Sequence, residues 1–131
     1  MARFMYKDVT SYRQKRFQVF ENLVKPIIAK NGHARILDVG GTRAYWDIAS
    51  DELKKNISVV LLNFDEALGD PREDDNFNVE YHQGDGCNMP EFADGSFDIV
   101  HSNSVIEHVG TLQNMGRFAD ETRRVGKAYY V

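Results

Sequence analysis

Apolar residues recur at three- and four-residue spacing in the first quarter of the chain. Between about residues 11 and 30 these positions are Phe17, Phe20, Leu23, Val24, Ile27 and Ile28. Such a stripe is typical of an amphipathic helix that packs on a sheet. Pro26 predicts a kink or a division into two helices, because proline lacks the backbone donor and clashes with the preceding turn. Asn31-Gly32 predicts the end of the helix.

Short apolar runs, each followed by polar residues or glycine, predict buried strands further along the chain. They cover residues 35–39, 58–62, 79–82, 97–102 and 128–131. Helical spacing predicts helices over about 44–54 and from about Thr111 to Gly126. The acidic segment 69–76, broken by Pro71, predicts a loop. Because strands alternate with helices, we expect a mostly parallel sheet with right-handed crossovers.

The stretch Arg-Ile-Leu-Asp-Val-Gly-Gly-Thr at residues 35–42 joins a predicted strand to a predicted helix. Glycine permits a positive φ and lets a ligand approach the backbone closely, and the first helical turn offers free N–H groups. Strand, acid, glycine turn and helix together predict a nucleotide-type cofactor site at the edge of the sheet. The glycines are adjacent, unlike the dinucleotide fingerprint G-x-G-x-x-G, and a glycine pair after a strand is also a common structural turn.

Size and composition narrow the classes of protein. The 131 residues predict a single domain, with an N-terminal helical segment (1–34) ahead of an α/β core (35–131). The net charge is −4 and no basic stripe is present, so nucleic acid is not expected as a partner. The single cysteine, Cys87, excludes an internal disulfide and fits a reducing compartment. No run is long and apolar enough for a membrane span, and we expect a cytoplasmic protein.

Polar residues follow four successive predicted strands: Asp38 with its glycines, Asn63, Asp85, and Asn103-Ser104. The carboxyl ends of parallel strands share one edge of a sheet, where ligands bind. Each residue alone is equally well explained as a turn or capping residue. Their coincidence at four strand ends favours a binding site.

This set of strand ends resembles that of the class I S-adenosylmethionine-dependent methyltransferases. The similarity is greatest to small bacterial members whose first strand reads like ILDVGGT and whose fourth reads like FDIVHSNSVIEHV, and it covers about residues 35–131. It implies a Rossmann-like three-layer α/β sandwich with strand order 3-2-1-4-5. The family's complete fold has two more strands, which this sequence is expected to lack. The open edge of the fifth strand would then favour a homodimer.

The resemblance also implies a cofactor, S-adenosylmethionine, with S-adenosylhomocysteine as product, and a role for each strand end. Asp38 would orient the glycine turn and reach the amino group of the methionine part, and Asn103 would contact that part through its carbonyl. Asn63 stands where the family usually has an acid that binds both ribose hydroxyls; an amide can accept one hydrogen bond and donate another. Asp85 would accept from the adenine amino group. The remaining cofactor-binding residues implied are Gly40, Gly41, Thr42, Gly86, Cys87 and Ser104.

Methyl transfer from a sulfonium needs positioning and exclusion of water more than a protein nucleophile. A general base helps only when the acceptor must lose a proton, and His108 is the candidate, with a structural role as the alternative. The histidines lack metal-ligand spacing, so no metal site is expected. The sequence therefore predicts methyl transfer to a small-molecule or glycan-like acceptor. A non-catalytic cofactor-binding or interaction module remains the alternative, and a nicotinamide-binding domain fits less well because the third glycine is missing.

Overall fold

The computed structural model describes residues 2–65, 76–103 and 109–131. Within them, five strands form one sheet: β1 (Ala34–Val39), β2 (Ile57–Asn63), β3 (Asn78–Gln83), β4 (Phe97–His101) and β5 (Gly126–Tyr130). Their order is β3-β2-β1-β4-β5 and every neighbouring pair is parallel. The predicted strand order is confirmed. The carboxyl ends of all these strands therefore share one edge.

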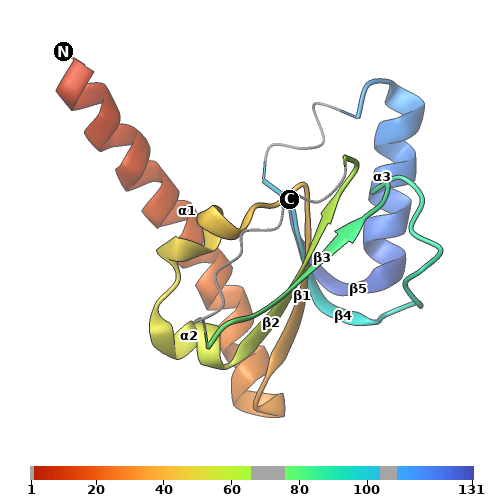
Figure 1. Cartoon of the computed structure of the whole chain (residues 1–131), viewed down its shortest axis with the longest axis horizontal. Coiled ribbons are helices and arrows are strands. Elements are labelled where there is room, and N and C mark those ends of the chain that lie inside the picture. The colour runs from red at the N-terminus through yellow and green to blue at the C-terminus, as the bar shows by residue number, and fades with distance from the viewer. Residues whose placement is uncertain (1, 66–75, 104–108) are drawn as a thin grey trace.

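Helices cover both faces of this sheet, as Figure 1 shows, with α1 (Ala2–Asn31) on one side and α3 (Leu112–Val125) on the other. Successive residues of the central strands alternate between the two faces. Ile36 and Ile99 pack in the cluster with Phe20 of α1, whereas Leu37 and Val100 pack in the cluster with Phe118 of α3. The sheet is thus buried on both sides, which explains why its central strands are apolar throughout. The expected three-layer architecture is confirmed.

The first helix differs from its prediction, since α1 begins at Ala2 and continues through Pro26 as one helix. The division expected at Pro26 is wrong. Pro26 has no N–H to donate to the Asn22 carbonyl four residues earlier. Both residues are exposed, so water can bond to that carbonyl instead. The buried face formed by Phe20 and Val24 keeps the helix on the sheet across the proline.

The helix expected over 44–54 is also wrong in detail, because the structure has two short helices, η1 (Arg43–Ile48, a 3₁₀-helix) and α2 (Asp51–Lys55). Ala49 between them is extended, and the Ser50 hydroxyl accepts the Leu53 N–H at 3.2 Å as the cap of α2. The last strand begins at Gly126, directly after α3, two residues earlier than expected. Most of the predicted acidic loop 69–76 lies outside the described residues.

Candidate functional site

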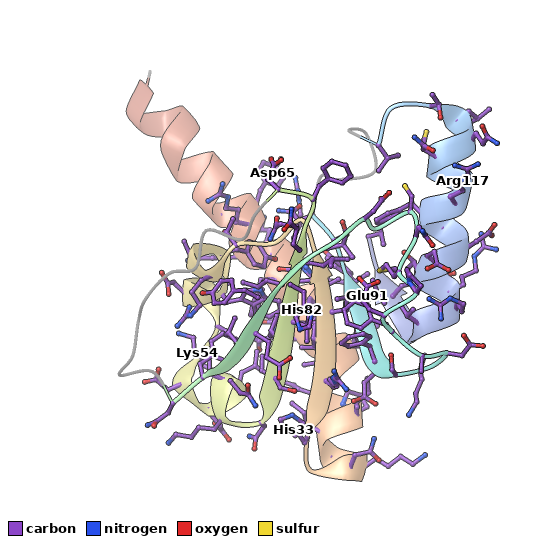
Figure 2. All side chains as sticks on the ribbon, turned by 45° about the vertical axis from the view of Figure 1, so that its right-hand side comes forward. His33, Lys54, Asp65, His82, Glu91 and Arg117 are labelled. Carbon is purple, nitrogen blue, oxygen red and sulfur yellow. The ribbon has the colours of Figure 1, made fainter. Side chains whose placement is uncertain are left out.

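A cavity of about 1140 Å³ opens at the carboxyl edge of the sheet, where β1, β2 and β3 end. Its described lining is Val39, Gly40, Gly41, Thr42, Arg43, Leu62, Asn63, Phe64, Asp65, Tyr81, Gly84, Asp85, Gly86, Cys87, Asn88, Val109, Asn114, Arg117 and Phe118. Figure 2 shows Asp65, after β2, and Arg117, on α3, at the same end of the molecule. The volume is slightly above the range of ~300–1,000 Å³ typical of small-molecule sites. It is large enough for a nucleoside-type ligand with a second molecule beside it.

The predicted cofactor residues fall into groups according to their position. Gly40, Gly41, Thr42, Asn63, Asp85, Gly86 and Cys87 all line the cavity. Two others, Asp38 and Asn103, are described but do not line it. Ser104 and His108 lie outside the described residues. The structure thus brings three of the four predicted strand ends to one cavity, and the individual roles stay predictions.

Asp38 is 1% exposed and lies in a hydrogen-bonded group of buried side chains below the glycine turn. Its Oδ2 accepts from Nε1 of Trp46 at 2.8 Å, and its Oδ1 lies 2.9 Å from Nδ1 of His101. A carboxylate can only accept, so Nδ1–H of His101 donates to Asp38, and in the neutral ring Nε2 is then an acceptor. The Tyr45 hydroxyl, 3.2 Å from that Nε2, then donates to it. Both oxygens of Asp38 are therefore engaged by the protein.

Burial, and next the nearby charge of Asp38, together raise the pKa of Tyr45 to about 12. The phenol therefore remains protonated at neutral pH and can keep donating to His101. The chain of donors from Tyr45 through His101 to Asp38 is complete, and it links η1, β4 and β1 directly beneath the turn. This group, Asp38, Tyr45, Trp46 and His101, is called the Asp38 network below.

The two adjacent glycines of the turn have separate physical reasons. Gly40 has a φ of 74°, a left-handed conformation that glycine adopts without strain. A Cβ on Gly41 would overlap the carboxylate of Asp38, so the second glycine is required by the buried acid below it. The Gly40 N–H also donates to the Leu62 carbonyl at 2.7 Å. The Gly-Gly pair, which departs from the dinucleotide fingerprint, thus follows from the left-handed turn at Gly40 and from the Asp38 carboxylate below Gly41.

At the end of β3 the local structure is a turn made by Asp85. Its Oδ1 accepts the Cys87 N–H at 2.8 Å, and its carbonyl accepts the Asn88 N–H at 3.0 Å. The turn role weighed from the sequence is therefore present. An exposed carboxylate has further lone pairs, so Asp85 can still accept from a ligand. Burial, and next the charge of Asp85, raises the pKa of the Cys87 thiol, which keeps it in the neutral form.

The loop that follows Asp85 is fixed to α3 through two charged residues. Arg124 donates to the Met89 carbonyl at 2.7 Å and to the Phe92 carbonyl at 2.8 Å, and it pairs with Glu121 at 2.8 Å. Glu121 in turn accepts the Met89 N–H at 2.6 Å. The hydrogen bond from Arg124 lowers the pKa of Glu121. A backbone N–H and two backbone carbonyls of the loop are thus hydrogen-bonded to side chains of α3.

Comparison with known proteins identifies the family. The family model described as "Methyltransferase domain" matches residues 37–128, which are most of the chain and include the ends of β1, β2, β3 and β4. This chain belongs to the methyltransferase-domain family. The resemblance to class I S-adenosylmethionine-dependent methyltransferases is thereby confirmed. No curated protein matches the sequence.

Solved structures of methyltransferases share the fold of this methyltransferase domain. An arsenic(III) S-adenosylmethionine methyltransferase from Chlamydomonas reinhardtii is 27% identical, with a TM-score of 0.53; the alignment covers 70% of this chain and 35% of that one. An S-adenosylmethionine-dependent methyltransferase from Methanosarcina mazei is 20% identical (TM-score 0.55), with 78% and 52% covered. Another from Archaeoglobus fulgidus is 21% identical (TM-score 0.54), with 86% and 48% covered. The domain thus spans about half or less of each structure.

Several cavity residues of the methyltransferase domain were missed from the sequence. Phe64 and Asp65 directly follow β2, so the strand-end rule that selected Asn63 also points to them. Arg43 follows the turn; it is 5% exposed, pairs with Asp47 at 3.1 Å and lies over the ring of Phe77.

Two further cavity residues, Asn114 and Arg117, lie three positions apart on α3 and so share a face of that helix. They come from a helix rather than a strand end, so no strand-end rule selects them. Their place beside the cavity follows only from the packing of α3 on the sheet.

Within the described ranges no helix is both long and apolar enough to cross a membrane, and no cluster of His, Cys, Asp or Glu is placed to hold a metal ion.

Proposed function

We propose that this methyltransferase domain binds S-adenosylmethionine in the cavity and directs its methyl group to a small-molecule or glycan-like acceptor. The observation that carries the proposal is the cavity itself, which is lined by the glycine turn and by the ends of β2 and β3. Sheets of this topology bind ligands at that edge. The cavity volume also leaves room for an acceptor next to the cofactor.

The residues present fit the chemical groups of this cofactor. Asp85 offers a carboxylate to the adenine amino group, with the backbone of Gly86 and Cys87 beside the ring. Asn63 offers an amide to the ribose hydroxyls. The turn Gly40-Gly41-Thr42 has no side chain at its first two positions, so the methionine part can approach the backbone.

Asp38 has a different role in this proposal from the direct contact expected from the sequence. Because both of its oxygens bind Trp46 and His101, it acts on the cofactor through the shape of the turn above it. Asn103 keeps its expected role at the methionine part and Ser104 its expected role in cofactor binding, and the role of His108 as a general base also stays a prediction.

The sulfonium of the bound cofactor supplies an already activated methyl group, so the protein contributes position and exclusion of water. In this proposal the glycine turn and the strand ends hold the cofactor, which is one of the two reactants. A general base is required only for acceptors that must lose a proton, which is the step in which we place His108. The Chlamydomonas relative acts on arsenic(III), which supports an acceptor of small size for this domain.

The direct test of transfer is incubation with S-adenosylmethionine labelled on the methyl group and a panel of small-molecule and glycan acceptors. We expect label in one acceptor class and equimolar S-adenosylhomocysteine. Binding of the cofactor without transfer to any acceptor would support the alternative, a non-catalytic cofactor-binding module. Sedimentation of the same sample tests the homodimer expected from the sequence.

A further inference from the structure

Asn63, at the carboxyl end of β2, is bonded to the strand ends on both sides of it. Its side-chain Nδ2 donates to the Gly41 carbonyl at 3.0 Å, and its own carbonyl accepts the Gly84 N–H at 2.8 Å. One residue earlier, the Leu62 carbonyl accepts the Gly40 N–H. Asn63 therefore connects the glycine turn after β1 with the residues after β3. All three segments line the cavity.

We propose that Asn63 is a positioning residue, which keeps the glycine turn in its binding shape by donating an N–H to the Gly41 carbonyl. The inference rests on the proposed cofactor site and adds to it a role that direct ribose contact does not include. The family resemblance places an acid here, but an aspartate at this position would weaken binding in this chain rather than strengthen it.

The reason is the chemistry of the two groups that meet. A carbonyl oxygen only accepts, and of the two isosteric side chains only the amide carries a donor. In Asn63→Asp a carboxylate oxygen would lie near the Gly41 oxygen, where both atoms carry negative charge. Gly41 has no room to move toward β1, because the Asp38 carboxylate fills the space on that side. The turn would have to shift elsewhere, and its bond between Gly40 and Leu62 would weaken with it.

A series of two substitutions separates this role from direct ribose binding. If Asn63 positions the turn, affinity for S-adenosylhomocysteine falls in the order wild type, Asn63→Ala, Asn63→Asp. Alanine leaves the Gly41 carbonyl open to water, whereas aspartate adds repulsion. If ribose contact alone matters, aspartate binds at least as well as wild type and alanine binds worst. For Asn63→Asp we expect a loss of ~10-fold or more, because a hydrogen bond to a part-buried acceptor is lost and repulsion between two oxygens is added.

Gln83→Glu is the matched control for the added charge. The Gln83 amide donates to the Phe64 carbonyl at 3.3 Å, at the neighbouring strand end, but Gln83 is exposed and does not line the cavity. Gln83→Glu replaces an amide by a carboxylate, as Asn63→Asp does, and it lies at the neighbouring strand end. We expect it to alter affinity by less than about 2-fold, since exposed pairs contribute little.

The experiment combines calorimetric titration with S-adenosylhomocysteine and amide hydrogen exchange, measured by NMR on the ligand-free chain. In Asn63→Asp the Gly40 N–H should exchange ~10-fold faster or more, because its bond to Leu62 is loosened. Unchanged Gly40 exchange, or an Asn63→Asp affinity equal to or above that of wild type, overturns the inference. If wild type itself binds no S-adenosylhomocysteine, the proposed function fails, and the exchange result still decides the positioning role.

Discussion

Two ends of the same cavity are built in opposite ways. The glycine turn after β1 lies on buried side chains, because Asp38, Trp46 and His101 are all almost fully buried and bonded to one another. The turn after β3 is exposed at Asp85, and it is fixed from outside by α3. Substitutions at the first end should therefore change cofactor binding and the stability of the core together. Substitutions at the second end should change cofactor binding while the stability of the fold stays almost constant.

The largest difference between the two ends is expected in the free energy of unfolding when the acid at each end, Asp38 or Asp85, is replaced by alanine. Asp38→Ala leaves the donors of Trp46 and His101 without an acceptor, which should lower the free energy of unfolding by about 3 kcal/mol. Asp85→Ala loses an exposed turn bond and should cost less than about 1.5 kcal/mol. Urea denaturation measures both values. We also expect Asp85→Ala to lose cofactor affinity while remaining folded; equal destabilisation by the two variants would contradict the contrast.

A smaller loss is expected when the steric contact below the turn is changed. Gly41→Ala places a Cβ on the Asp38 carboxylate and should destabilise by about 1–3 kcal/mol, the range for overpacking. Gly116→Ala in α3 is the control, since nothing lies within 4 Å of its Cβ position. That variant should gain about 0.5–1 kcal/mol from helix propensity. Equal unfolding free energies for the two variants would show that Asp38 can move away freely.

Tyr45→Phe tests the outermost bond of the Asp38 network. Loss of the hydroxyl that donates to His101 should cost about 0.5–1.5 kcal/mol at pH 7. The pKa of Tyr45 is raised in the fold, so the stability linked to it is present below the ordinary tyrosine pKa of about 10. It is lost as pH rises toward about 12. Wild type should therefore lose more stability than Tyr45→Phe between these pH values, and parallel urea midpoints would argue against the raised pKa of Tyr45.

The smallest effect is expected at the second end of the cavity, from Glu121. Its pKa is lowered in the fold by the hydrogen bond from Arg124, so its contribution is present above the ordinary glutamate pKa and is lost as pH falls through the lowered value. Glu121→Gln should be slightly less stable than wild type at pH 7, and its stability should fall less on acidification. Urea midpoints at pH 7 and under acid conditions measure this difference. Identical acid profiles for the two proteins would mean that Arg124 does not stabilise the charged form.

The same contrast explains how far the sequence alone could lead. The strands and their polar ends could be predicted, because apolar runs, glycine turns and polar residues after strands are local signals, whereas the strand order was implied by the family resemblance. These signals located the glycine turn, Asn63 and Asp85 of the cavity, and the family resemblance added Thr42, Gly86 and Cys87. The division of the helix after the turn could not be predicted, since it depends on Ser50 acting as a cap inside a stretch that also fits a helix.

The Asp38 network could not be predicted either. His101 lies sixty-three positions after Asp38, and its burial against Trp46 and Tyr45 follows from the packing of β4 and η1. In the sequence His101 is a histidine on a predicted strand and Trp46 an apolar residue of a predicted helix, and no local pattern marks either as a partner of Asp38. The Asn63 contact with Gly41 joins two strand ends in the same way. Long-range pairs of this kind carry no local sequence signal.

The most direct test of the account is calorimetric titration of the purified chain with S-adenosylhomocysteine, with a nicotinamide dinucleotide as the control ligand. Trp46 is the only tryptophan and is fully buried, so its fluorescence reports that the chain is folded in the same sample. We expect S-adenosylhomocysteine to bind at roughly micromolar concentration and the nicotinamide not to bind. A folded chain that binds neither ligand, or that prefers the nicotinamide, would contradict the assignment of this cavity.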